Sequence, residues 1–272
     1  MDLSQALEIA VCTDAGMVRS HNEDSIAADP IKGIVVLADG MGGYNAGEVA
    51  SGMATTVITA ELQRALDAHS TAEGEASGAL AQRLLAEQIA KANGSIFQEA
   101  QTQPQYAGMG TTLVAAMFHD NKVTVAHIGD SRMYRLRHEK LDQLTRDHSL
   151  LQEQIDSGMI TPEQAKFSQN KNLVTRALGI DPVADPEVHS FDTQVHDIYL
   201  LCSDGLNDMV SDEDIAMTIQ TLAANLRLAA QQLVQMANDN GGRDNISVML
   251  VRIVRDYASQ RGWFERLLGW MK

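Results

Sequence analysis

Short apolar runs dominate this chain, and they constrain its fold more than any other feature. Six of them are rich in branched residues and are bounded by Gly, Asp, Asn or Lys: EIAVCT, GIVVLAD, TTLVAAMF, KVTVAHIGD, DIYLLCSD and NISVMLVRI. Runs of this length and composition predict β-strands. The stretch KVTVAHIGDSRMYRLRHEKLDQL has room for two or three strands with tight connections. We therefore expect meandering antiparallel sheet.

Helical periodicity appears between some of these runs. Apolar residues recur at helical spacing over about 47–69 and, in a second segment, over about 79–100. A later segment places one apolar stripe on Leu226, Ala230, Leu233 and Ala237. A helix with one apolar face packs that face against other structure, so we expect all three to lie on sheet.

The chain is expected to form one domain over residues 1–256, followed by a short tail. The polar segment at about 147–178 predicts an inserted flap of short helices between two strands. The tail, 257–272, contains RGWFERLLGWMK, in which aromatic and aliphatic residues alternate with Arg and Lys. Three alternatives stand for this amphipathic tail: docking against its own domain or a partner protein, lying at a membrane surface, or disorder.

Composition narrows the range of partners. The chain has 272 residues and a formal net charge of -15, from 21 basic and 36 acidic side chains. That charge opposes binding to nucleic acid, which requires clustered Lys and Arg. The two cysteines, Cys12 and Cys202, lie inside apolar runs and are interpreted as core residues. With no signal peptide pattern and no run of about 18 apolar residues, we expect a cytoplasmic protein.

Four aspartates stand where strands are predicted to end or begin. Asp39, Asp130 and Asp204 each end an apolar run and stand next to a Gly. Asp244 stands just before another apolar run. In an antiparallel sheet, strand starts and strand ends share an edge, so the four carboxylates can converge. The electrostatic repulsion between two like charges a few ångströms apart is several kcal/mol at an effective dielectric of about 20. Hard divalent cations such as Mg²⁺ or Mn²⁺ would relieve that repulsion.

The alternative interpretation is that each Asp-Gly pair is only a turn, because this pair is common in turns. For Asp39 the following residues, GMGGYNAGE, lead into a helix through four glycines instead of resuming a strand. Such a glycine-rich connection is typical of backbone that approaches a ligand closely.

A second polar group lies near the N-terminus, in RSHNED. Arg19 has the side chain best shaped to hold a phosphate through two parallel hydrogen bonds. Glu23 and Asp24 can join a metal cluster directly or through water. The alternative is a solvated charged turn. Together with the aspartates, these residues predict a phosphate clamp beside a metal site.

At this point the pattern resembles the metal-dependent protein phosphatases, the protein phosphatase 2C family, and its bacterial members in particular. Eight motifs carry the resemblance across nearly the whole chain, in the family's order: RSHNED, LADGMGG, GMGTTLV, HIGDSRMY, LTRDHS, VTRALG, LCSDGL and GGRDNISV. The resemblance implies an α+β fold, with a central β-sandwich of two antiparallel sheets flanked by pairs of helices in four layers, and a two-metal site at one end.

The resemblance also implies a role for each candidate residue. Asp39 is similar to the carboxylate that bridges both metals, and the Gly40 carbonyl to a ligand of the second. Asp204 and Asp244 match ligands of the first metal, and Glu23 and Asp24 match holders of metal-bound water. Asp130 matches a ligand of a weaker third site in bacterial relatives. Arg19 matches the residue that binds substrate phosphate.

These parts support direct hydrolysis of phosphoserine and phosphothreonine in proteins. A water shared by two Mn²⁺ or Mg²⁺ ions about 4 Å apart would attack phosphorus in line. The proton for the leaving group is open, because many eukaryotic members have His where this chain has Met41. His21 or a metal-bound water are the alternatives. Tyr44, where some bacterial relatives have His, is not assigned a role.

Two rival functions stand beside this one. The first is a pseudophosphatase that binds phosphoproteins without hydrolysing them, against which the full set of matching ligands argues. The second is another metal hydrolase, such as a nuclease, which the acidic charge disfavours. The expected partners are phosphoproteins made by a Ser/Thr kinase of the same cell, and we expect a monomer.

Overall fold

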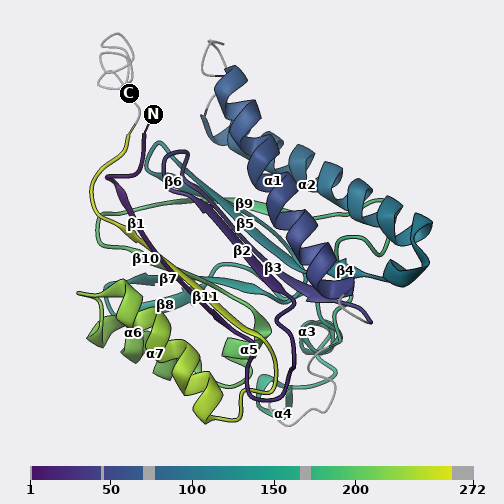
Figure 1. Ribbon diagram of the computed structural model, residues 1–272. Helices are drawn as coiled ribbons and strands as arrows, with labels where there is room; N and C mark the ends of the chain where they lie inside the picture. Colours follow the sequence, from purple (N-terminus) through teal and green to yellow (C-terminus); the bar gives the residue numbers. More distant parts are fainter. Residues whose placement is uncertain (1, 44–45, 70–76, 166–172, 259–272) are drawn as a thin grey trace.

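Two antiparallel sheets lie face to face at the centre of the molecule, with helices on both outer faces (Figure 1). The structure is a computed structural model that describes residues 2–43, 46–69, 77–165 and 173–258. The predicted α+β fold, a four-layer sandwich of two antiparallel sheets between helix pairs, is confirmed.

The first sheet joins the two ends of the chain. Its strand order is β1-β11-β10-β7-β8. The first and last strands pair along their whole length, with Leu7 opposite Ile253 and Asp14 opposite Ile246. The strands of this sheet are β1 (Leu7–Asp14), β7 (Arg132–Arg137), β8 (Lys140–Gln143), β10 (Ile198–Cys202) and β11 (Ile246–Ile253).

The second sheet has the order β2-β3-β5-β6-β9, and the short β4 pairs with β3. The predicted meander does not stay in one sheet, since β6 and β7 belong to different sheets and residues 129–131 connect them. Its strands are β2 (Asp24–Asp29), β3 (Ile34–Met41), β4 (Gly110–Thr111), β5 (Leu113–His119), β6 (Lys122–Ile128) and β9 (Glu187–Asp192).

Two long helices cover the second sheet and two shorter ones cover the first (Figure 1). The three predicted helices are confirmed as α1 (Ala46–His69), α2 (Ser77–Thr102) and α7 (Leu226–Asp239). The fourth, α6 (Asp212–Thr221), was not predicted. A 3-10 turn, η1 (Pro104–Tyr106), follows α2.

Strand alternation decides which side chains enter the space between the sheets. In β3, Ile34, Val36 and Ala38 pack with α1 and α2, whereas Val35 and Leu37 pack against the other sheet. Successive side chains of a strand point to opposite faces. Asp39 therefore continues the inward series, at the end of the sandwich.

The segment predicted as a flap begins with two short helices, α3 (Leu150–Asp156) and α4 (Pro162–Ala165). The Ser149 side chain caps α3 by accepting a hydrogen bond from the Gln152 N–H at 3.2 Å.

Residues 166–172 lie outside the described part, as do residues 259–272 of the predicted tail. Within the described ranges, no helix combines the length and apolar character needed to cross a membrane.

Candidate metal and phosphate site

Two carboxylates face each other where β2 and β3 run side by side. Asp24 is the direct cross-strand partner of Asp39. The Ser203 hydroxyl, which comes from the other sheet, donates to Asp24 Oδ2 at 2.8 Å. The second oxygen, Asp24 Oδ1, is buried and has no hydrogen-bond partner among the described residues. A buried acceptor without a donor is uncommon in native proteins, and a bound cation would satisfy it.

Asp130 and Asp204 follow one strand of each sheet, β6 and β10. The sequence predicted Asp204 at the end of a strand. Instead, it is the first residue of the single-turn helix α5 (Asp204–Asn207). This turn packs tightly on the start of β11, because a Cβ added at Gly205 would lie 2.0 Å from the backbone oxygen of Asn245. The carboxylates thus come from both sheets, and not from one shared edge.

Asp244 lies just before β11, beside Arg19, the residue predicted to bind phosphate. Arg19 Nη2 donates to Asp244 Oδ2 at 2.7 Å. The Arg19 side chain is 55% exposed, whereas that of Asp244 is 28% exposed. The guanidinium therefore reaches the carboxylate cluster and still faces solvent, where a phosphate group can approach it.

Asn245 ties the N-terminal polar segment to the start of β11, a role that was not predicted for it from sequence. Its Oδ1 accepts from the Glu23 N–H at 2.7 Å. Its Nδ2 donates to the His21 carbonyl at 2.8 Å and to the Ala15 carbonyl at 3.1 Å. An Asn after Asp in a Gly-rich segment is also typical of an ordinary turn, so no local pattern distinguishes this role.

Gly40 lies at a close crossing of backbone. Its N–H donates to the Glu23 carbonyl at 3.1 Å. A Cβ at Gly40 would lie 2.1 Å from the Gly47 oxygen, and a Cβ at Gly47 would lie 2.7 Å from Glu23 Oε2. The glycines that follow Asp39 therefore let the start of α1 approach both β3 and the Glu23 carboxylate.

The clustered carboxyl groups hold their protons more tightly than isolated ones. Burial, reinforced by the charges of neighbouring carboxylates, raises the pKa of Asp39 and of Asp204 well above its usual value. Burial is also the largest cause that raises the pKa of Asp24 to about 6 and that of Asp130 to about 7. Burial raises the pKa of Glu23 as well. Positive charge among these groups would reverse the shifts.

Every candidate site residue except Asp24 lines one cavity of about 250 Å³, which we call the central cavity. Met41 lines it too, as does Val174 from the segment that returns from the predicted flap. His21 is exposed and is not among the lining residues. Tyr44 lies outside the described residues.

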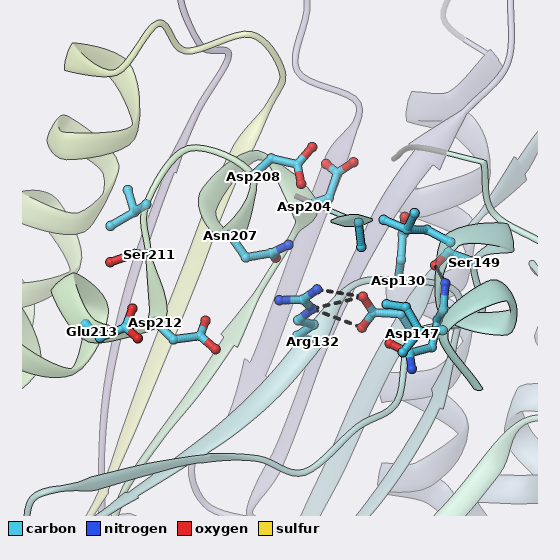
Figure 2. A pocket seen from close by; sticks show the side chains of 15 residues that line it. Asp130, Arg132, Asp147, Ser149, Asp204, Asn207, Asp208, Ser211, Asp212 and Glu213 are labelled. Carbon is cyan, nitrogen blue, oxygen red and sulfur yellow. Dashed lines mark hydrogen bonds and ion pairs between the residues drawn. The ribbon is translucent and has the colours of Figure 1, made fainter. Parts of the chain in front are cut away.

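A second cavity of about 330 Å³ lies on the side of α3 and is called the flap cavity (Figure 2). Asp130 and Asp204 line both cavities, so the two meet at these carboxylates. In the flap cavity, Arg132 holds Asp147 through three hydrogen bonds of 2.7–3.1 Å, drawn as dashed lines in Figure 2.

Neither cysteine is suited to act as a nucleophile. Cys202 is fully buried, and burial raises the pKa of its thiol to about 12. The pKa of Cys12 is raised by burial as well. Because the thiolate is the reactive form, covalent catalysis through cysteine is disfavoured. The atoms at the central cavity that could bind a metal are carboxylate and carbonyl oxygens, which suit a hard divalent cation.

The fold and this cluster of carboxylates agree with comparisons to known proteins. A family model described as protein phosphatase 2C matches residues 10–240. The chain belongs to the protein phosphatase 2C family, as the eight sequence motifs predicted.

Its similar relatives are bacterial serine/threonine phosphatases. PstP of Mycobacterium tuberculosis is 39% identical over 251 residues, which are 92% of this chain and 46% of that protein. The chain thus spans about half the length of PstP. The phosphatase stp of Listeria welshimeri is also 39% identical, over 88% of this chain and 93% of that protein.

Solved structures show the same architecture. The catalytic domain of PstP in complex with two manganese ions superposes with a TM-score of 0.76 at 37% identity, covering 92% of this chain and 99% of that one. The Staphylococcus aureus phosphatase Stp1 gives a TM-score of 0.81 at 33% identity, covering 94% of this chain and 98% of the other.

Proposed function

We propose that this chain hydrolyses phosphoserine and phosphothreonine in proteins and uses divalent cations held at the central cavity. The observation that carries the proposal is the convergence of Asp39, Asp204 and Asp244 from two sheets on one cavity, with Arg19 at its rim. Membership of the protein phosphatase 2C family and similarity to the two-manganese PstP domain support it.

Each candidate ligand has a proposed role. Asp39, which ends the inward series of β3, would bridge two cations, and the Gly40 carbonyl would bind the second. Asp204 and Asp244 would bind the first. Glu23 and Asp24 would hold cation-bound water, a role that suits the unpartnered Asp24 Oδ1.

A third, weaker cation site is proposed at Asp130 with Asp204. Both carboxylates line the central cavity and the flap cavity, so a cation there would stand between the two.

The reaction proposed is attack of water on phosphorus with displacement of the serine or threonine oxygen. Bound cations would lower the pKa of the attacking water and offset charge on the phosphate oxygens. Arg19 would hold the phosphate by charge-assisted hydrogen bonds and orient the leaving oxygen away from the carboxylates. Met41 offers no proton and His21 does not line the cavity, so we assign the leaving group's proton to water.

Turnover of p-nitrophenyl phosphate by the purified chain tests the enzyme against the pseudophosphatase. We expect Mn²⁺-dependent hydrolysis that EDTA and Asp39→Asn both abolish. Asp67→Asn is the matched control, since Asp67 is an exposed aspartate whose side chain pairs with Lys32 on the surface. Absence of turnover across Mn²⁺ and Mg²⁺ concentrations would favour the pseudophosphatase. If turnover occurs, its rates with Mn²⁺ and with Mg²⁺ show which cation is preferred.

Substrate choice separates the phosphatase from the nuclease. Phosphothreonine peptides should be hydrolysed in preference to bis-p-nitrophenyl phosphate, a diester. Preference for the diester would contradict the proposal. The physiological partners would be phosphoproteins made by a Ser/Thr kinase in the same cytoplasm, and the chain would act as a monomer.

The tail remains a separate prediction, because residues 259–272 lie outside the described part. Tyr257, the first residue of the predicted tail, belongs to the core, since it is 1% exposed and its hydroxyl is 2.7 Å from Thr193 Oγ1. For the residues after it we propose contact with their own domain, with a partner protein or with a membrane surface. Deletion from residue 261 onward should abolish sedimentation with anionic liposomes if the membrane is the target. Equal sedimentation of both forms would refute contact with the membrane.

A further inference from the structure

Two stacked histidines and a glutamate lie at the base of the predicted flap, beside the central cavity. His127 on β6 is directly opposite Glu187 on β9. The ring of His148 stacks on that of His127, with centroids 4.9 Å apart and an angle of 17° between the planes. His148 Nε2 is 3.1 Å from Glu187 Oε1. Both histidines are buried, with exposed fractions of 1% and 6%.

The hydrogen bonds of His148 define where its ring proton lies. The Gly129 N–H donates to His148 Nδ1 at 3.2 Å, so Nδ1 is the acceptor and Nε2 carries the proton toward Glu187. Ligand atoms of the three residues lie within 4.8 Å of one another. A cation at Nε2 would require the ring proton to move to Nδ1, which would break the Gly129 bond, or to be lost altogether. The cluster is therefore better suited to orient His148 than to bind a metal.

His148 holds Gly129 through both backbone polar groups of that residue, the N–H and the carbonyl. Besides the bond to Nδ1, the His148 N–H donates to the Gly129 carbonyl at 2.9 Å. Gly129 adopts a φ of 102°, a conformation that favours glycine. The next residue is Asp130, whose side chain is 7% exposed and lines both cavities. The backbone that precedes Asp130 is thus fixed by one histidine.

The other side of the same connection is fixed to Asp39. Ser131 Oγ and Thr112 Oγ1 are 2.7 Å apart. Thr112 Oγ1 accepts from the Asp39 N–H at 3.2 Å, and the Thr112 N–H donates to the Asp39 carbonyl at 2.9 Å. Residues 129–131 are therefore held at Gly129 by His148 and at Ser131 by Thr112, which in turn bonds the Asp39 backbone.

His148 also joins both stems of the predicted flap. Its carbonyl accepts from the Thr175 N–H at 2.8 Å, on the returning stem. Its neighbour Ser149 caps α3, on the outgoing stem. A displacement of His148 would consequently move the Asp130 backbone and the base of the flap together.

We propose that His148, oriented by Glu187, is a positioning residue that sets the place of Asp130 and thereby the cation affinity of the central cavity. The inference rests on the proposed function, since it concerns the same cations. Loss of partners that orient metal ligands typically costs about 10–100-fold in metal affinity or activity. His148→Ala should therefore raise the Mn²⁺ concentration for half-maximal binding by about tenfold and lower kcat. KM for the phosphopeptide should change little, because Arg19 belongs to a different segment.

Two amide variants provide the discriminating test. In His148→Asn, the short side chain places an acceptor near the former Nδ1 and keeps the Gly129 bond. In His148→Gln, the longer side chain reaches toward Glu187 but does not restore that bond. We expect Asn to restore Mn²⁺ affinity toward that of the unchanged protein and Gln to behave like Ala. Glu187→Gln, which keeps an acceptor for Nε2–H, should be milder than Glu187→Ala.

Direct calorimetric titration with Mn²⁺ measures affinity without requiring turnover, so failure of the phosphatase proposal is distinguishable from failure of this one. His119→Ala is the matched control, because His119 bonds Thr124 at the opposite end of the β5–β6 pair. Circular dichroism and thermal unfolding monitor folding. Unchanged Mn²⁺ affinity in His148→Ala, or equal losses in the Asn and Gln variants, would overturn the proposal. If the Ala variant does not fold, the Asn, Gln and Glu187 variants decide it.

Discussion

At the scale of single residues, the buried carboxylates in and beside the central cavity oppose folding when no cation is bound. The pKa of Asp24 is raised to about 6 and that of Asp130 to about 7, chiefly by burial, from an ordinary value of 3.8. A group with a raised folded pKa binds more protons in the folded state than in the unfolded one. Its contribution to stability is present at low pH and is lost as pH rises through the folded pKa.

We therefore predict that the cation-free protein loses stability between about pH 4 and pH 7 as these groups ionise. Thermal unfolding in EDTA should give a Tm that falls across this window. With saturating Mn²⁺ the fall should be much smaller, because bound cations favour the ionised carboxylates. A Tm in EDTA that rises from pH 5 to pH 7 would contradict the prediction.

The same reasoning predicts opposite effects of one substitution on activity and on stability. Asp39→Asn should abolish turnover yet raise the Tm of the cation-free protein at pH 7.5, because it removes one of several like charges from a buried cluster. Unfolding in EDTA measures the second effect. The Asp67→Asn control should change neither quantity appreciably, and a lower Tm for Asp39→Asn would show that repulsion is not dominant.

Arg19 should matter for phosphate and hardly at all for folding. Its pair with Asp244 is largely exposed, and such pairs contribute about 0–1 kcal/mol. We predict that Arg19→Ala lowers kcat/KM for a phosphothreonine peptide by about tenfold or more, because charge-assisted bonds to the phosphate are lost. Arg64→Ala, an exposed arginine of α1, is the control. Equal kcat/KM for both variants would remove Arg19 from the proposed site.

The sequence indicates only part of this site at residue level. Asp39, Asp204 and Asp244 are visible because each adjoins an apolar run. Asn245 and Ser203 are not, since their partners lie far away in sequence: Asn245 bonds Glu23 across 222 residues, and Ser203 bonds Asp24 across 179. Hydrogen bonds at such separations leave no local periodicity to detect.

At the scale of elements, α5 connects two candidate ligands. Asp204 opens this single turn, and Gly205 packs on the Asn245 backbone that follows Asp244. A Cβ at Gly205 would meet the Asn245 oxygen at 2.0 Å and its carbonyl carbon at 2.9 Å, so the backbone would have to move. The distance between the two carboxylates depends on that contact.

Gly205→Ala should accordingly lower stability by about 1–3 kcal/mol, the usual cost of overpacking, and impair Mn²⁺ binding. Chemical denaturation and calorimetric titration measure the two effects. Gly94→Ala is the matched control, because Gly94 lies inside α2 with open space around it. That control should gain about 0.5–1 kcal/mol. Normal Mn²⁺ binding in Gly205→Ala would show that α5 adjusts without moving Asp204.

The elements that were not predicted from the sequence have weak apolar patterns. β9, with the sequence EVHSFD, is an edge strand with no fully buried residue, so it lacks the apolar run that marks central strands such as β3 and β11. In α6 only Ile215 and Ile219 are buried, and the first turn is acidic. By contrast, β3 and β11 are buried nearly throughout, and their composition alone predicts strands.

At the scale of the whole molecule, the net charge of -15 should influence which substrates arrive quickly. Long-range attraction raises association rates for molecules of opposite charge and weakens with salt, since the screening length is about 10 Å at 0.1 M. Phosphopeptides rich in Lys and Arg should therefore be favoured at low ionic strength.

We predict that kcat/KM for a basic phosphothreonine peptide falls several-fold between about 20 mM and 300 mM NaCl. For an acidic peptide with the same central residues it should rise or stay level. Initial rates at fixed Mn²⁺ measure both, and p-nitrophenyl phosphate reports any direct effect of salt on the site. Parallel declines for the two peptides would exclude steering by the overall charge.

The pairing of β1 with β11 has a consequence for biosynthesis. The second sheet has all its strands once residue 192 has been made, but β1 has no partner on this side until residues 246–253 follow. Arg19, on the segment after β1, meets Asp244 only then. A nascent chain in which β11 has not yet been made therefore lacks a finished site, and translation products truncated before β11 would be inactive.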